Sequence, residues 1–113
     1  MVRVNTIAAP LPVYCQFELF IAQLLEQKGY QIIYHNIQVA GVQIDLLARE
    51  PSENVLTIVE VKSSNHMSSI SARQLRRLFR VGEVIAQFEP VELLLVTMNE
   101  GHLLVIPIDG LTV

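Results

Sequence analysis

Apolar side chains recur every three or four positions in two stretches of the chain, and polar side chains fill the positions between them. This spacing is typical of helices that bury one side, and it predicts helices over residues 14–28 and 71–88. Gly29 and Pro90 follow these stretches, and both residue types commonly end helices. Ser71 is the predicted N-cap of the second helix, because its hydroxyl can accept a hydrogen bond from an unpaired backbone N–H.

Each predicted helix carries one apolar stripe that should face the core. In the first helix the stripe consists of Phe17, Phe20, Ile21, Leu24 and Leu25. In the second helix it consists of Leu75, Leu78, Phe79, Ile85 and Ala86. Glu18 lies beside the first stripe rather than opposite it.

Five shorter runs, rich in Val, Ile and Leu, predict strands. They cover residues 30–39, 42–50, 55–62, 91–98 and 102–108. Short turns separate the first three runs, so these strands should form an antiparallel meander. The second helix joins the third run to the fourth, and a helical crossover favours a parallel pair. The predicted fold class is α/β, with a mixed five-stranded sheet flanked by helices.

The third predicted strand, VLTIVEVK, ends on a carboxylate and an ammonium group in an otherwise apolar run. Side chains alternate between the two faces of a strand, so Glu60 and Lys62 share a face. A four-residue turn before this strand would make Glu50 the partner of Val55. Counting back along both strands then puts Asp45 opposite Glu60. A slip of one residue would move Asp45 to the other face, so this prediction depends on the register.

Two carboxylates that close together repel each other, so a divalent cation, a shared proton or the lysine must stabilise them. Mg²⁺ takes oxygen ligands, often one or two carboxylates with water and substrate phosphate. Such a site activates water and stabilises a phosphate under attack. The alternative is a strand end that emerges into solvent with a weak surface ion pair. Glu-x-Lys alone favours that alternative, whereas Asp45 on the neighbouring strand favours a functional site.

Composition limits the class of protein further. The 113 residues suit one domain, and Pro10 and Pro12 predict an extended arm over residues 1–13. Hydrophobic residues make up 51%, with a mean hydropathy of +0.42, so the core or a partner must cover much apolar surface. No apolar run reaches the roughly 18 residues that cross a bilayer. Cys15 is the single cysteine, which excludes an internal disulfide and favours a reducing, cytoplasmic setting.

The net charge of −3 does not suggest a nucleic-acid-binding protein, but the distribution of basic residues does. Four of the eight lie in the second predicted helix, namely Arg73, Arg76, Arg77 and Arg80. Arginines so placed are suited to contact DNA backbone phosphates without selecting a base sequence. A solvated helix face explains them equally well.

Two motifs, GVQIDLLA at 41–48 and VEVK at 59–62, resemble the PD-(D/E)xK nuclease superfamily. The likeness is greatest to YraN-like proteins and archaeal-type Holliday junction resolvases, and it covers residues 14–98 in order and spacing. This resemblance implies a restriction-endonuclease-like αβββαβ core, in a single nuclease-like domain over residues 1–113.

By the same resemblance, Asp45 and Glu60 would be metal ligands, with the Val61 carbonyl as a third, and the metal would be Mg²⁺ or Mn²⁺. Lys62 would act on the attacking water or on the phosphate. Glu18 matches a glutamate of the first helix that often lies near the metal in relatives. Helix geometry alone gives a solvent-facing Glu18 equal weight.

Gln74 resembles a polar helix residue that lies near the site in some relatives, and it joins the four arginines as a predicted DNA-binding residue. Two positions depart from the pattern of YraN-like sequences. Gln43 stands where they often have Glu, and Ser64 stands where they often have Arg. Neither departure removes a ligand, but both bear on substrate binding and on metal affinity.

The leading hypothesis is a Mg²⁺-dependent DNA endonuclease that hydrolyses phosphodiester bonds, with branched or structured DNA suggested by the resemblance alone. The rival is a catalytically inactive DNA-binding or dimerising module that retains the nuclease fold. A third alternative is a dimerising protein without a nucleic-acid partner. The apolar hairpin at 91–108 is expected to be core, or else the surface of a homodimer such as resolvases form.

Overall fold

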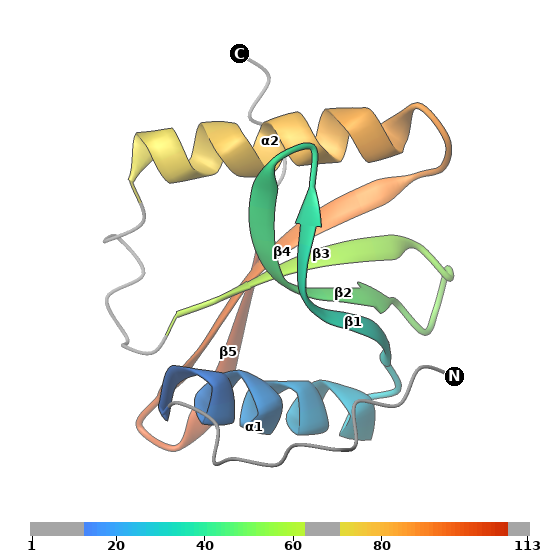
Figure 1. Cartoon of the computed structure of the whole chain (residues 1–113). Helices are drawn as coiled ribbons and strands as arrows, with labels where there is room; N and C mark the ends of the chain where they lie inside the picture. Colours follow the sequence, from blue (N-terminus) through green and yellow to red (C-terminus); the bar gives the residue numbers. More distant parts are fainter. Residues whose placement is uncertain (1–12, 63–70, 109–113) are drawn as a thin grey trace, which may run out of the picture.

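The computed structural model describes residues 13–62 and 71–108, which form two helices and five strands in the predicted order (Figure 1). The helices are α1, Val13–Gln27, and α2, Ala72–Ala86. The strands are β1, Gln31–Val39, β2, Val42–Arg49, β3, Leu56–Val61, β4, Val91–Asn99, and β5, His102–Pro107. The predicted arm, apart from Val13, and the segment that contains Ser64 lie outside the described residues.

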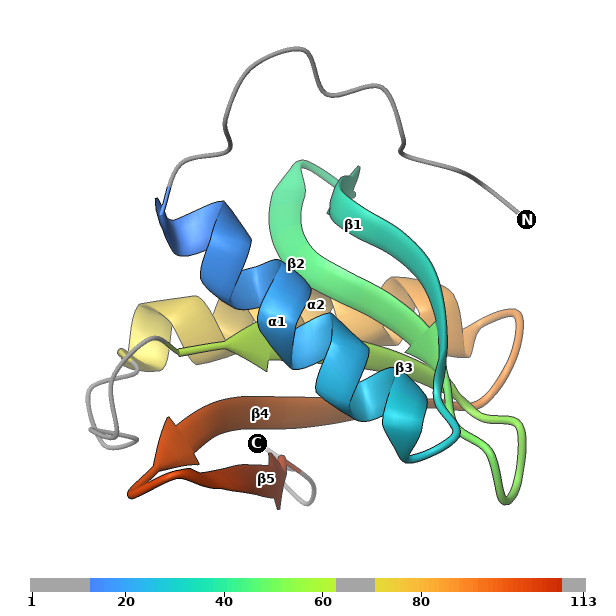
Figure 2. The same ribbon diagram turned by 90° about the horizontal axis from the view of Figure 1, so that it is seen from below.

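All five strands form one mixed sheet in the order β1-β2-β3-β4-β5. Neighbouring strands are antiparallel except β3 and β4, which are parallel and are connected through α2. The two helices lie on opposite sides of the sheet, with α2 above it and α1 below it in Figure 1. Seen from below, α1 lies across the strands (Figure 2). The predicted α/β class, with its mixed five-stranded sheet flanked by helices, is confirmed.

Each helix closes a hydrophobic core against its own side of the sheet. On the α1 side, Ile21 and Leu25 pack with Leu46, Val59, Leu94 and Val96. On the α2 side, Leu78 and Val81 pack with Ile44, Leu47, Ile58 and Leu93. Full burial of one such aliphatic side chain contributes about 1.5–3 kcal/mol. Because β3 is buried from Leu56 to Glu60, the carboxyl group of Glu60 lies in the interior of the protein.

The buried side of α1 is centred nearer to Glu18 than the sequence predicts. Ile21, Ala22 and Leu25 face the sheet, but Phe20 is 45% exposed. Successive helical residues are about 100° apart, so Phe20 lies on the far side of the helix from these three. Glu18 lies one turn before Ile21 and Ala22, near the centre of the buried side. The prediction for Phe20 is wrong. Because Glu18 is polar, the spacing of apolar residues alone could not show that the side of α1 around Glu18 is the buried one.

The start of α2 is the predicted one, whereas its stripe is shorter than predicted. The buried residues of α2 are Leu78, Val81 and Gly82. Ala86 is exposed, because it lies at the edge of the side that faces the sheet. The Ser71 side chain accepts a hydrogen bond from the Gln74 N–H at 3.0 Å, which confirms Ser71 as the N-cap. This cap fixes the first turn, where Gln74 lies.

Gly29 connects α1 to β1 with a backbone that favours glycine. Its φ is 97°, and a Cβ at this position would lie 3.1 Å from the Cβ of Pro51. A larger residue would therefore meet both backbone strain and the turn between β2 and β3. Glycine lets α1 end close against that turn, which sets where α1 crosses the sheet.

Candidate active site

The register of β2 and β3 is the predicted one. Across the four-residue turn, the Glu50 N–H donates to the Val55 carbonyl at 2.9 Å. The pairs that follow run in step as far as Leu46 and Val59, where the ladder ends. Asp45 is the next residue along β2, and the same count places it beside the end of β3.

Where the β2–β3 ladder ends, a side chain instead of a backbone carbonyl accepts the next hydrogen bond from β3. Asp45 Oδ2 accepts a hydrogen bond from the Val61 N–H at 2.8 Å. Asp45 also influences the pKa of both Glu60 and Glu18, so it is the central carboxyl of the group. The structure therefore brings together the acids that the sequence predicts on β2 and β3.

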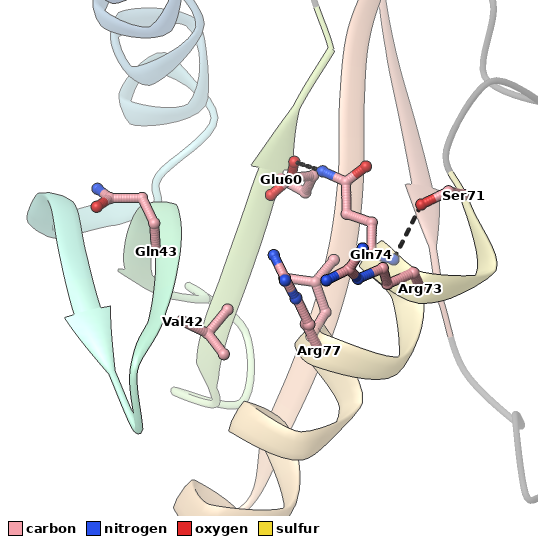
Figure 3. Close-up of a pocket in the computed structure, with 8 residues that line it drawn as sticks. Val42, Gln43, Glu60, Ser71, Arg73, Gln74 and Arg77 are labelled. Carbon is pink, nitrogen blue, oxygen red and sulfur yellow. Dashed lines mark hydrogen bonds between the residues drawn. The ribbon is translucent and has the colours of Figure 1, made fainter.

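Glu60 and Lys62 meet the start of α2 through Gln74. Glu60 is only 7% exposed, and its Oε2 accepts a hydrogen bond from Gln74 Nε2 (Figure 3). Lys62 Nζ donates to Gln74 Oε1 at 3.0 Å and lies 4.0 Å from Glu60 Oε2. The alternative of a solvent-exposed Glu60 is therefore wrong. Gln74, predicted to contact DNA, is bonded at both ends of its amide to predicted catalytic residues.

Glu18 brings a third carboxyl group to Asp45, from α1. It is 8% exposed, so the solvent-facing alternative is wrong. Burial, and then the charge of Asp45, raises the pKa of Glu18 to about 7. Its Oε1 is buried and has no hydrogen-bond partner among the described residues. A buried carboxylate oxygen without a hydrogen-bond partner destabilises the fold unless a proton or a cation binds it.

Burial dominates the electrostatics of the other two acids as well. It raises the pKa of Asp45, although the hydrogen bond from the Val61 N–H acts in the opposite direction. Burial, and then the charge of Asp45, raises the pKa of Glu60 to about 7, and Lys62 opposes this shift. The three acids together are thus poorly stabilised as anions by the chain itself. Protons or a divalent cation would stabilise them.

The residues present fit a magnesium or manganese ion that keeps some of its waters. In the described ranges, no three His, Cys, Asp or Glu side chains form a group that could hold a metal by themselves. Mg²⁺ does not require such a cage, because it commonly uses one or two carboxylates with water and phosphate oxygens. The carboxylates of Asp45 and Glu60 and the backbone carbonyl of Val61 are oxygen ligands of this kind. The buried Glu18 Oε1 adds an oxygen without a partner.

Thr97 supports the site and was missed in the sequence. The Lys62 N–H donates to the Val96 carbonyl at 2.9 Å, and Thr97 Oγ1 donates to the Lys62 carbonyl at 2.6 Å. β4 therefore holds the backbone of Lys62 after the β3 strand has ended. The signal in the sequence was a hydroxyl inside an apolar central strand, where it must find a partner.

Asn36 is the second missed residue. It lies in β1 between the pairs His35 with Leu46 and Ile37 with Ile44, so it is level with Asp45. Its φ is 51°, a left-handed conformation that asparagine tolerates better than most residues. Its side chain stabilises the charged form of Glu18 and so opposes the rise in the pKa of that carboxyl. Asparagine inside a strand is uncommon, and this was the available signal.

A pocket of about 400 Å³ opens beside Glu60, between α2 and β2 (Figure 3). Val42 and Leu78 form its apolar wall. Its polar lining consists of Gln43, Glu60, Ser71, Arg73, Gln74 and Arg77. Arg76 and Arg80, the other two arginines of α2, do not line it. The candidate site thus consists of a group of acids and, next to these acids, a pocket that is lined by two arginines.

The comparison with known families agrees with the two motifs. Residues 17–97 match the family described as "Uncharacterised protein family UPF0102", and this range contains every predicted metal ligand. The chain belongs to the UPF0102 family. The resemblance to YraN-like proteins of the PD-(D/E)xK superfamily is thereby confirmed.

Two individual similarities accompany the family match. A UPF0102 protein of Pelobacter propionicus is 37% identical over 51 residues, which is 45% of this chain and 36% of that protein. A solved structure, described as the EndoMS-dsDNA2 complex, superimposes with a TM-score of 0.54 at 15% identity. That alignment covers 86% of this chain and 42% of the EndoMS chain, so this UPF0102 chain spans less than half the length of either protein. At such low identity the likeness to EndoMS shows a shared fold.

Proposed function

We propose that this UPF0102 protein is a metal-dependent endonuclease that hydrolyses phosphodiester bonds of DNA. The observation that carries the proposal is the meeting of half-buried Asp45 and buried Glu60 beside Lys62 at the end of β3. Acids so placed have little structural value of their own, because burial disfavours their charged forms. A hard cation and a phosphate are the ligands that would make use of them.

Asp45 and Glu60 would hold Mg²⁺ or Mn²⁺, with the Val61 carbonyl as a further ligand and Glu18 close by. The ion would supply a more acidic bound water and stabilisation of phosphate charge. Lys62 Nζ donates to Gln74 Oε1, and an ammonium group has three donors, so Lys62 could also orient a water or a phosphate oxygen. Gln74 thus sets the position of both Glu60 and Lys62.

DNA is the proposed substrate because the arginines of α2 are exposed next to these acids. Arg73, Arg76, Arg77 and Arg80 all lie on the solvent side of the helix. They are suited to backbone phosphates and supply no base-specific arrangement. The EndoMS structure with a similar fold is a complex with double-stranded DNA, which supports the same substrate class. Branched or structured DNA is the preferred form on the resemblance to resolvases.

The proposal is tested by incubating supercoiled and branched DNA with the purified chain and Mg²⁺ or Mn²⁺. We expect cleavage that EDTA stops and that Glu60→Gln lowers by at least about a hundredfold, since each tenfold corresponds to about 1.4 kcal/mol of transition-state stabilisation. Equal cleavage by the wild type and Glu60→Gln would refute it, because a contaminating nuclease would behave in this way.

One observation favours the rival, an inactive DNA-binding module with this fold. Gln74 already hydrogen-bonds both Glu60 and Lys62, so these two side chains have polar partners without a metal ion. Such a module would bind DNA in a salt-dependent manner and show no heat of Mn²⁺ binding in calorimetry. Binding of Mn²⁺ by the wild type and its loss in Asp45→Asn would reject the rival.

The partner and location predictions are separate from the chemistry. In the described ranges, no helix has the length and apolar character needed to span a membrane. The homodimer and the cytoplasmic setting stay predictions. Sedimentation of the purified chain at several concentrations tests the homodimer directly.

A further inference from the structure

The four arginines of α2 divide into two pairs with different surroundings. Arg73 and Arg77 are one turn apart and both line the pocket beside Glu60. Arg76 and Arg80 have the same spacing and the same exposure but lie outside that lining. Figure 3 shows Arg73 and Arg77 extending from α2 into the space before β2. Two pairs that match in charge and spacing therefore differ in whether they meet a pocket.

Neither Arg73 nor Arg77 forms an ion pair within the described residues. The ion pairs recorded among the described residues join Arg49 to Glu89 and Lys62 to Glu60. Neither includes an arginine of α2. The first turn of α2 also lacks acidic residues, so its positive dipole end adds to the local potential. Two adjacent guanidinium groups in this position favour an anion between them.

We propose that Arg73 and Arg77 form a subsite for one backbone phosphate of the DNA strand, next to the phosphate at the Asp45 and Glu60 site. The inference rests on the proposed function for the identity of the ligand. Guanidinium forks bind phosphate oxygens in a fixed geometry, and Ser71 and Gln43 add neutral hydrogen-bonding groups to the same pocket.

The subsite also assigns different roles to the two pairs. The pocket pair would fix the register of the strand relative to the acids, because its ligand is confined. Arg76 and Arg80 would contribute only to the general attraction of the helix for DNA, which acts without a fixed contact. Loss of two charges should therefore have unequal effects, although both pairs are exposed on the same helix.

Binding of a short oligothymidylate strand, measured by calorimetry in EDTA at low salt, tests this assignment. We expect the double variant Arg73→Gln, Arg77→Gln to bind about tenfold more weakly or worse. The matched double variant Arg76→Gln, Arg80→Gln should lose less than about threefold. For the pocket pair, the slope of log K against log salt should fall by about 0.7 for the lost phosphate contact.

A second arm identifies the contact itself. One phosphate of the strand at a time is replaced by an uncharged methylphosphonate. At one position this replacement should weaken binding to the wild type and have no further effect on the Arg73→Gln, Arg77→Gln variant. Equal losses in the two arginine variants, additive effects at every phosphate, or no binding by the wild type would overturn the subsite.

These measurements are independent of cleavage. A wild type that binds the strand through the pocket pair but never cleaves DNA with Mg²⁺ or Mn²⁺ would refute the nuclease and leave the subsite intact. Metal-dependent cleavage with an unchanged KM in Arg73→Gln, Arg77→Gln would refute the subsite and leave the nuclease intact.

Discussion

The two ends of the β2–β3 hairpin stabilise their charges in opposite ways. At the turn, hydrogen bonds from the Ser52 side chain and then from the Glu53 backbone hold the pKa of Glu50 below its usual value. Arg49 pairs with Glu89 at 2.6 Å in the same region. At the other end, burial raises the pKa of the acids, and a buried carboxylate oxygen lacks a partner among the described residues.

The difference separates a structural use of charge from a functional one. At the turn, the chain supplies its own hydrogen bonds, so the carboxylate of Glu50 favours folding. At the far end, the charged forms of Asp45 and Glu60 disfavour folding, because they leave water without sufficient compensation. A protein that retains such a site gains something other than stability from it. Variants matched between the two ends can therefore test this contrast.

The largest contrast should appear in metal affinity. Asp45→Asn removes one carboxylate oxygen from the proposed ligands, so we expect Mn²⁺ affinity to fall by at least about a hundredfold. Glu50→Gln, in the same hairpin, should leave that affinity within about twofold. Calorimetry with Mn²⁺ on the three proteins measures both. Similar losses of Mn²⁺ affinity in the two variants would contradict a metal site at Asp45.

The second contrast concerns pH. The raised pKa values, about 7 for Glu18 and Glu60, mean that the folded protein holds protons which the unfolded chain releases between about pH 4.5 and 7. The free energy of unfolding of the metal-free protein should therefore fall as pH rises through this window. Glu50 has a lowered pKa, so its contribution is present above about pH 4.5 and is lost as pH falls.

Urea unfolding in EDTA at several pH values measures this difference in sign. The double variant Glu18→Gln, Glu60→Gln should lose the fall between pH 5 and 7.5, whereas Glu50→Gln should keep it. At pH 8 in buffer without EDTA, free Mn²⁺ at 100 times its dissociation constant should restore about 2.7 kcal/mol to the wild type. A fall of undiminished size in the double variant would show that Glu18 and Glu60 are not its origin.

The third contrast uses two asparagines with left-handed backbones. Asn36 lies level with Asp45 at φ 51°, and Asn54 lies in the turn at φ 60°. Glycine accepts both conformations, so each Asn→Gly change removes the amide with little backbone strain. Asn36→Gly should weaken Mn²⁺ binding about tenfold by releasing Glu18, and Asn54→Gly should not. Equal Mn²⁺ affinities in the two variants would remove Asn36 from the site.

The smallest contrast uses two fully buried threonines. Thr57 Oγ1 donates to the Val55 carbonyl at 3.1 Å near the turn, and Thr97 Oγ1 donates to the Lys62 carbonyl at the site. Each Thr→Val change should cost about 1 kcal/mol of unfolding free energy. Only Thr97→Val should also lower kcat, with KM little changed, because Lys62 moves. A kcat effect from Thr57→Val of the same size would point to a general loss of stability.

Much of the fold and the central pair of acids were predictable because they depend on local rules. Strand alternation and a four-residue turn were enough to place Asp45 beside the end of β3, and the pairing of Glu50 with Val55 confirms that count. Glycine, proline and a serine cap marked the helix ends. These features need only neighbours in the sequence or one turn between two strands.

The remaining parts of the site depend on contacts between distant elements. The rotation of α1 that buries Glu18 is set by packing against the sheet, and apolar periodicity cannot detect a buried acid. Gln74 bonds to Glu60 and Lys62 only because α2 starts next to the end of β3. The separation of the arginines into two pairs likewise requires the pocket wall that β2 provides.

The hydrogen bond from the Val61 N–H to Asp45 Oδ2 gives the protein a spectroscopic reporter of its own. A backbone amide that donates to a carboxylate changes its proton resonance when the charge on that carboxylate changes. Protonation of the acid, or its capture by an ion, would therefore appear at one peptide group without any attached label. Nuclear magnetic resonance of this single amide would follow the occupancy of the site in solution, even when no DNA is present.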